Sequence, residues 1–213
     1  MKISKSIGIF GGAFDPIHLG HIIPIMELRA RYFLDKVIYI PTFISNSKKN
    51  IEATPEQRLE MLKISLQNRE CEIDRREIDN KNISYTIDTL NSITQDFPDY
   101  KLIVIIGQDN LVSLPDWKDF EKVLSLCNII VMNRQTSNDT KQSHKYLEIL
   151  KNRICSDRSV FNNQSNGNII IEQTTSINIT STDIREKLSR GEPIEGLVDK
   201  KLENWLKQNR IYQ

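Results

Sequence analysis

The stretch Gly11–His21, Gly-Gly-Ala-Phe-Asp-Pro-Ile-His-Leu-Gly-His, constrains the fold of this chain more than any other part of the sequence. A short apolar run at 6–10 precedes it and is typical of a buried strand. After it, apolar residues recur at the spacing of the inner face of a helix, at Ile22, Ile23, Ile25, Met26, Leu28, Ala30 and Phe33. The stretch is therefore predicted to be the turn between a strand and a helix.

The residue types in this turn favour an anionic ligand. Gly11 and Gly12 lack a Cβ, so we expect the backbone to turn there and to lie close to a ligand. Gly20 lets the helix begin beside that ligand, with its free N–H groups and positive dipole end toward it. His18 and His21 are three residues apart, which places both rings on one side of a first helical turn. A phosphate-bearing substrate fits this combination, whereas no metal site is predicted because no third ligand of the usual kind lies nearby.

Two of the chain's three histidines lie in this stretch. A lone histidine beside a glycine turn is usually a surface or capping residue, but a pair framed by glycines favours a functional site. The pattern G-G-x-F-D-P-x-H-x-G-H resembles the signature of the nucleotidyltransferase superfamily with the H-x-G-H motif. That resemblance implies transfer of a nucleotidyl group from a nucleoside triphosphate to a phosphate or a similar acceptor.

Composition narrows the class of protein. With 213 residues, the chain has the length of one α/β domain with a sizeable core. Its 29 basic and 28 acidic residues give a net charge of +1. The chain therefore has no large positive charge that would attract nucleic acid or an anionic membrane surface. No stretch reaches the about 20 apolar residues of a membrane span. A start that runs directly into the first strand and three scattered cysteines without C-x-x-C lead us to expect a cytoplasmic protein.

Further strands are predicted at 36–40, 71–78, 101–106, 128–132 and 168–172. The order strand, helix, strand within the first forty residues predicts a parallel pair with a right-handed crossover. Helices are expected after Thr54, whose sequence fits a capping box, from Ser84, around Trp117 and near 142–152. Two more are expected towards the end, one that carries Ile184 and Leu188 and ends near Gly191, and one at 200–208. The sequence therefore predicts an α/β fold, a Rossmann-like doubly wound parallel sheet with helices on both faces.

Polar residues follow two other predicted elements. Asp109 stands just past the strand 101–106, where ligands of parallel sheets bind, and it suits either a ribose diol or the cap of the next helix. Ser181 and Thr182 are ordinary helix caps, but Arg185 one turn later adds a fixed cation and favours a second phosphate site. Lys48, in the polar loop 41–53, either reaches phosphate or lies at a solvated loop tip.

Taken together, the motifs resemble those of bacterial nicotinate-nucleotide adenylyltransferases. The first motif is followed in order by S-Y-T-x-x-T-L, I-I-G-x-D, a tryptophan and S-T-x-I-R, so the resemblance spans nearly the whole chain. It implies that ATP and nicotinate mononucleotide give nicotinate adenine dinucleotide and pyrophosphate, with Mg²⁺, on the route to NAD. It also implies a single domain over 1–213 in which 179–213 completes the ATP site. A homo-oligomer is left open.

The same resemblance implies roles for individual residues. The catalytic residues would be His18, His21 and Arg185. ATP would contact Gly11, Gly12, Phe14, His18, Gly20, His21, Gly107, Asp109, Ile179, Ser181, Thr182 and Arg185. Nicotinate mononucleotide would contact Asp15, Lys48, Ser84, Tyr85, Thr86, Trp117 and Arg134. Within these sets, Ser84–Thr86 would surround the nicotinate carboxylate, Trp117 would stack on the pyridine ring, and Arg134 would contact the mononucleotide phosphate.

One departure and two alternatives accompany this interpretation. The family usually carries a histidine in the loop after the second strand, whereas this chain has Ser45-Asn46-Ser47-Lys48 and keeps only the cation. A transferase acting on phosphopantetheine or a polyol phosphate is disfavoured by Ser84–Thr86 together with Trp117. A non-catalytic sensor of NAD precursors is disfavoured because His18, His21 and Arg185 are all present.

Overall fold

A computed structural model describes residues 5–44, 51–133 and 148–213 of the chain. The strands are β1 (Ser6–Gly12), β2 (Lys36–Pro41), β3 (Cys71–Ile73), β4 (Lys101–Gly107), β5 (Cys127–Asn133), β6 (Ile154–Cys155) and β7 (Ile169–Gln173). The helices are α1 (Leu19–Tyr32), α2 (Pro55–Leu66), α3 (Arg76–Asn80), α4 (Thr86–Asp96), α5 (Gln108–Leu111), α6 (Phe120–Leu126), α8 (Arg158–Asn163), α9 (Ser181–Ser189) and α10 (Lys200–Gln208), with a 3₁₀ turn η1 (Leu114–Asp116).

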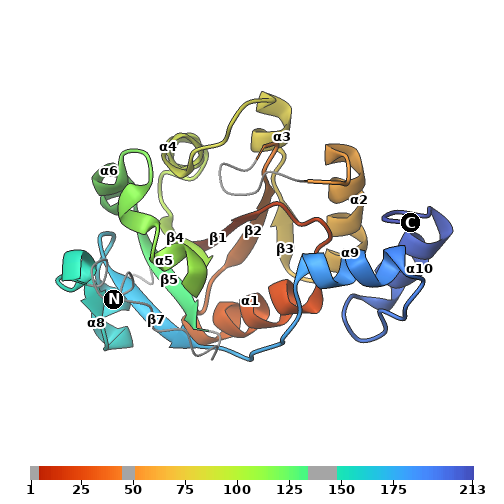
Figure 1. The fold of residues 1–213 in the computed structure, drawn as a ribbon. Helices are drawn as coiled ribbons and strands as arrows, with labels where there is room; N and C mark the ends of the chain where they lie inside the picture. The colour runs from red at the N-terminus through yellow and green to blue at the C-terminus, as the bar shows by residue number, and fades with distance from the viewer. Residues whose placement is uncertain (1–4, 45–50, 134–147) are drawn as a thin grey trace. The chain divides into compact units, whose positions relative to one another are not determined.

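The strands form one seven-stranded sheet in the order β3-β2-β1-β4-β5-β7-β6 (Figure 1). β4 pairs in parallel with β1 and β5, and β7 pairs in parallel with β5 and β6. This confirms the predicted Rossmann-like α/β class. In the part of the chain that is described, no helix is long and apolar enough to cross a membrane.

The chain divides into two compact units, which are described separately. Unit 1 comprises Met1–Phe10, Glu27–Val37 and Tyr85–Thr175, and unit 2 comprises Gly11–Met26, Ile38–Ser84 and Ser176–Gln213. The single domain over 1–213 stays a prediction.

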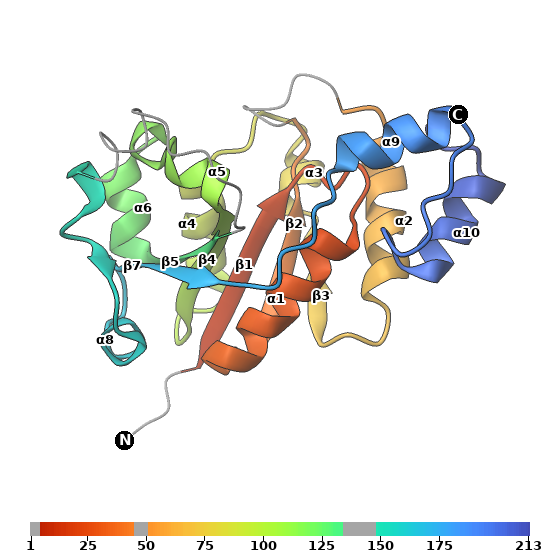
Figure 2. The ribbon, with the colours of Figure 1, turned by 60° about the horizontal axis from the view of Figure 1, so that its bottom comes forward.

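Unit 1 is built around β4 and β5. Apart from their terminal residues, both strands are fully buried, as expected of apolar runs covered on both faces. Within this unit, α4 and α6 lie on one face of the sheet and the last turns of α1 lie on the other (Figures 1 and 2). The predicted covering of both faces is therefore seen here.

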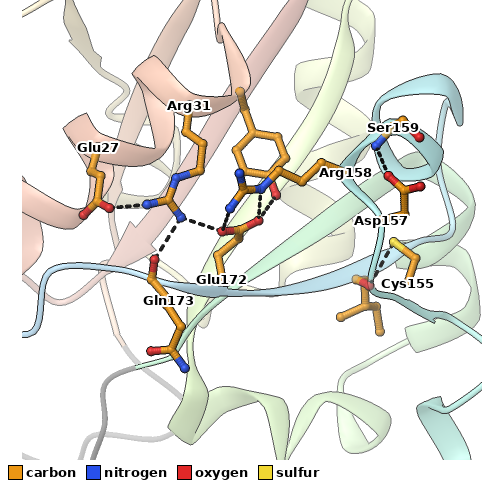
Figure 3. A network of polar contacts seen from close by, with 10 residues as sticks. Glu27, Arg31, Cys155, Asp157, Arg158, Ser159, Glu172 and Gln173 are labelled. Carbon is orange, nitrogen blue, oxygen red and sulfur yellow. Dashed lines mark hydrogen bonds and ion pairs between the residues drawn. The ribbon is translucent and has the colours of Figure 1, made fainter.

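A buried carboxylate on β7 is the centre of a network of polar side chains in unit 1 (Figure 3). Glu172 is only 4% exposed, and it accepts hydrogen bonds from Arg158 at 2.7 and 2.9 Å, from Arg31 at 2.5 Å and from the hydroxyl of Tyr32 at 2.5 Å. Burial by itself would raise the pKa of Glu172, but the donors from Arg158, Tyr32 and Arg31 outweigh it and lower the pKa. The network therefore holds an ionised carboxylate inside the unit.

Unit 2 contains the helices whose starts the sequence marks most clearly. Thr54 Oγ1 accepts from the backbone N–H of Gln57 at 3.2 Å, and the side chain of Gln57 accepts from the N–H of Thr54 at 2.8 Å. This confirms the capping box of α2. Thr180 caps α9 in the same way with Asp183, and Asp199 caps α10. α10 packs against α2 (Figure 2).

Several predicted elements differ in extent. The strand expected at 71–78 ends at Ile73 and is followed by α3, because the charged residues 74–77 are better suited to a short exposed helix than to a strand. Trp117 lies in extended backbone at the end of η1 rather than in a helix, and α6 begins only at Phe120. β6 and α8 were not predicted. Of the helix expected near 142–152, residues 148–150 are helical and the earlier part lies outside the described residues.

Replacing Glu172 with Gln is expected to lower the free energy of unfolding at pH 7 by about 1–3 kcal/mol, because two arginines lose a buried anion. The lowered pKa of Glu172 stabilises the fold above the ordinary glutamate pKa of about 4.3, and this stabilisation is lost as the pH falls through the folded-state pKa. The difference between wild type and variant should therefore shrink in acid. Urea unfolding at pH 7, 5 and 3 measures it.

Glu121→Gln is the matched control, because Glu121 pairs with Arg153 at the surface of the same unit at 3.2 Å. Such exposed pairs contribute little, so this variant should match the wild type at every pH. A stability difference for Glu172→Gln that stays constant from pH 7 to 3 would contradict the expected role of its charge.

Candidate active site

Residues 13–21, which comprise the connection between β1 and α1 and the first three residues of α1, are called the histidine loop below. The loop turns at Phe14, whose φ of 51° lies in the left-handed region. Gly11 and Gly12 belong to β1, so the expectation that these glycines form the turn is wrong. The side chain of Phe14 is 2% exposed, and its ring meets the ring of His21 edge-on with 5.5 Å between centroids. Burial of the phenylalanine ring thus holds a backbone conformation that a bulky residue seldom adopts.

The two histidines of the loop lie together. Their rings stack with 3.7 Å between centroids and 23° between planes, and the backbone N–H of His18 points to Nδ1 of His21 at 3.4 Å. His18 is 2% exposed, whereas His21 is partly accessible. The prediction that both rings lie on one side of the first turn of α1 is confirmed.

Gly20 allows this close packing. A Cβ at residue 20 would lie 3.0 Å from Nδ1 of His18 and 3.5 Å from the carbonyl oxygen of Ile177. The first of these distances is tighter than ordinary contacts, so a larger residue would displace the His18 ring. The start of α1 therefore stays close to both imidazoles.

Asp15 anchors the loop through its side chain. Its carboxylate is 3% exposed and accepts from the backbone N–H of Glu52 at 2.8 Å, from that of Ala53 at 3.0 Å and from the hydroxyl of Tyr212 at 2.7 Å. A buried carboxylate needs such donors, since an unpaired one is very costly. The carboxylate is thus held inside the protein, and its predicted contact with nicotinate mononucleotide stays a prediction.

Two side chains of α9 hold the backbone of the loop. Arg185 donates from Nη1 to the carbonyl oxygen of Asp15 at 2.8 Å and from Nε to Oε1 of Glu52 at 2.7 Å. Ser181 Oγ donates to the carbonyl oxygen of Pro16 at 3.0 Å. The structure therefore brings Ser181 and Arg185 to the loop that carries His18 and His21.

Arg58 of α2 supports the loop from inside unit 2. It is completely buried, and its Nη1 donates to the carbonyl oxygen of Ala13 at 2.7 Å. Burial lowers the pKa of Arg58, while the charge of Asp15 acts in the opposite direction. The guanidinium thus places a positive charge near the buried carboxylate.

Asp183, at the start of α9, interacts with the histidine loop through its charge. The pKa of Asp183 is lowered, first by hydrogen bonds from Thr180 and to a smaller extent by the charge of His18. Thr180, rather than Ser181 or Thr182, is the cap, which leaves the hydroxyl of Ser181 to the loop. Thr182 is exposed and Ile179 is buried.

The remaining predicted residues of unit 1 lie at element ends. The helix expected from Ser84 begins at Thr86, and Tyr85 is its N-cap residue without a side-chain cap. Gly107 precedes α5, and Asp109 is exposed within that helix rather than capping it. Trp117 is half-buried. Lys118 lies over the ring of Tyr85, 4.5 Å from its centroid, and brings a cation that the sequence motif does not contain.

Ser84, Lys48 and Arg134 are the remaining predicted residues. Ser84 is half-buried in unit 2. Lys48 and Arg134 lie outside the described residues.

Sequence reasoning missed Glu52, Arg58 and Tyr212. Arg58 precedes the buried apolar residue Leu62 by one helical turn, so the position of Arg58 in the sequence carried a usable signal. Glu52 and Tyr212 contact the histidine loop only through the tertiary fold, and nothing local marks either residue.

Comparisons with known proteins identify the family that this chain resembles. The family described as cytidylyltransferase-like matches residues 9–187. A probable nicotinate-nucleotide adenylyltransferase of Legionella pneumophila (strain Lens) is 34% identical over 209 residues, which cover 98% of this chain and 99% of the relative. One of Psychromonas ingrahamii is 30% identical over 210 residues, with 98% of each chain covered.

A solved structure shares the fold. Nicotinic acid mononucleotide adenylyltransferase of Plasmodium falciparum, complexed with NaAD, superposes with a TM-score of 0.75 at 16% sequence identity. The match covers 98% of this chain and 97% of that one.

Proposed function

This chain belongs to the cytidylyltransferase-like family and, within it, to the nicotinate-nucleotide adenylyltransferases, and on that premise we propose the reaction it carries out. It transfers the adenylyl group of ATP to nicotinate mononucleotide, giving nicotinate adenine dinucleotide (deamido-NAD) and pyrophosphate in NAD biosynthesis. The observation that carries the proposal is the stacked pair His18 and His21 at the start of α1, in a chain matched over 98% of its length by a relative of this name.

The chemistry needs little from the protein beyond alignment and charge. A phosphate oxygen of nicotinate mononucleotide forms the new bond to the α-phosphorus of ATP, and the bond from that phosphorus to the bridging oxygen breaks. Pyrophosphate leaves with the electron pair. The attacking phosphate is already ionised, so no side chain has to act as a base. Donors at His18, His21 and the start of α1 would stabilise the charge that builds up on the α-phosphate.

Arg185 suits the departing pyrophosphate. A planar guanidinium binds phosphate oxygens in a bidentate way, and its Nε now contacts the exposed carboxylate of Glu52. Pyrophosphate would replace Glu52 on that edge, while Nη1 keeps its bond to the carbonyl oxygen of Asp15. Ser181 and Thr182 at the start of α9 remain proposed pyrophosphate contacts.

The start of α4 is a suitable binding site for the nicotinate carboxylate. Backbone N–H groups at Thr86 and beyond offer donors for a carboxylate, in the way that helix starts bind anions. Trp117 is proposed to stack on the pyridine ring, and Gly107 and Asp109 are proposed to hold the ribose of ATP.

Nucleotidyltransferases of this family generally use a divalent metal, and we propose Mg²⁺ bound with ATP. Among the described residues, no group of three His, Cys, Asp or Glu side chains could hold a metal ion. Mg²⁺ prefers oxygen ligands, keeps several waters and commonly binds through substrate phosphates, so a metal carried by the triphosphate fits this site. When bound, it neutralises phosphate charge.

One prediction of the proposed function concerns the substrate. Pyrophosphate should be released from ATP when nicotinate mononucleotide is added, and the amide form should react with a kcat/KM lower by about tenfold to several thousandfold. The amide presents an NH₂ group to donors that suit two oxygens, and each buried mismatch costs roughly 1–3 kcal/mol. Steady-state kinetics with the two mononucleotides measures this. Absence of release with the acid would overturn the function, and equal kcat/KM values would overturn the selectivity.

Another prediction of the proposed function concerns His21. In His21→Ala, kcat should fall by about 10²–10³, as expected when one preorganised donor is lost, with a smaller change in KM. His144→Ala is the control, since His144 is the third histidine and lies outside the motif. A near-normal kcat for His21→Ala, measured by pyrophosphate release, would remove His21 from the catalytic residues.

A further inference from the structure

We propose that Tyr212 is a positioning residue for adenylyl transfer, which fixes the histidine loop through the side chain of Asp15. The inference rests on the proposed function and adds to it a residue that lies nearly two hundred positions from the loop. The hydroxyl of Tyr212 donates to Oδ1 of Asp15 at 2.7 Å, and the two residues are 197 positions apart in the sequence.

The backbone around Tyr212 is set for this contact. Tyr212 has a φ of 66° and Arg210 a φ of 49°, both in the left-handed region. Such a conformation is costly for a bulky residue and persists only where the surrounding structure enforces it. Burial raises the pKa of the Tyr212 hydroxyl, and the Asp15 charge raises it further, so the hydroxyl stays protonated and remains a donor.

The contact completes the anchoring of Asp15. Oδ2 accepts from the N–H of Glu52, while Oδ1 accepts from the N–H of Ala53 and from Tyr212. Without the hydroxyl, Oδ1 would keep one donor at 3.0 Å inside a site that water does not reach freely. The buried carboxylate would then shift to regain a partner.

A shift of Asp15 would reach the histidines directly. The backbone of the loop is fixed at Asp15 by Arg185 and at Pro16 by Ser181, and His18 follows three residues after Asp15. Catalysis by alignment is sensitive to small displacements of this kind. Tyr212 is therefore expected to act on kcat more than on KM, because it touches the loop that carries the donors and not the substrate.

The test compares Tyr212→Phe with Tyr32→Phe. Tyr32 makes the same kind of contact in unit 1, where its hydroxyl donates to the buried carboxylate of Glu172 at 2.5 Å. Both variants lose one hydroxyl from one buried acid, so both should lower the melting temperature by about 2–4 °C. Only Tyr212→Phe should lower kcat, by about tenfold or more, with KM values for ATP and nicotinate mononucleotide within about threefold of wild type.

Asp15→Asn supplies a second route, because it keeps the shape of the side chain but weakens the acceptor. If Tyr212 acts through Asp15, the double variant should lose no more kcat than the more severe single variant. Independent, multiplying losses would overturn the coupling.

The outcomes separate the inference from the function on which it rests. An active wild type with an unchanged kcat in Tyr212→Phe would overturn the positioning role alone. Equal losses of kcat in Tyr212→Phe and Tyr32→Phe would overturn it as well, because they would mark a general effect of stability. A wild type that releases no pyrophosphate would overturn the proposed function together with the inference.

Discussion

The histidine loop depends on one buried anion. Asp15 is 3% exposed, and its carboxylate accepts hydrogen bonds from the N–H groups of residues 52–53 and from the hydroxyl of Tyr212, with Nη1 of Arg185 3.9 Å from Oδ2. An ionised carboxylate without such partners would be expelled or neutralised. Arg58 and Arg185 then fix the neighbouring carbonyl oxygens of Ala13 and Asp15. Segments distant in the sequence are thus needed to hold a loop of nine residues.

The same principle serves a different purpose in unit 1. Glu172 is as buried as Asp15 and also accepts from a tyrosine, yet its other partners are the side chains of Arg31 and Arg158, which join β7 to α1 and α8. There the carboxylate ties secondary elements together. Around Asp15, two of the three donors to the carboxylate are backbone N–H groups, and the element they stabilise carries the stacked pair His18 and His21. A buried, hydrogen-bonded carboxylate therefore ties secondary elements together in unit 1, whereas in unit 2 it positions the loop that carries the histidines.

Local signals predicted most of the fold. The capping box at Thr54, the apolar run at 101–106 and the helix at 200–208 each follow from neighbouring residues, and each is confirmed. The placement of the His18 and His21 rings on one side of the first helical turn also follows from their spacing, whereas their stacking was not predicted. The partners of Asp15 could not be predicted, because they lie 37 to 197 residues away and are chosen by tertiary packing. The turn at Phe14 was missed for a related reason, since burial of its ring overrides the conformational preference for glycine.

A crystal structure of the chain with a non-hydrolysable ATP analogue and Mg²⁺ would test the central claim most directly. The account predicts that the triphosphate lies against His18, His21 and the start of α1, with Arg185 released from Glu52. It also predicts that the Asp15 carboxylate keeps its contacts with Tyr212 and the N–H groups of residues 52–53. A triphosphate bound away from the histidine loop, or an Asp15 carboxylate that has lost its contact with Tyr212, would contradict it.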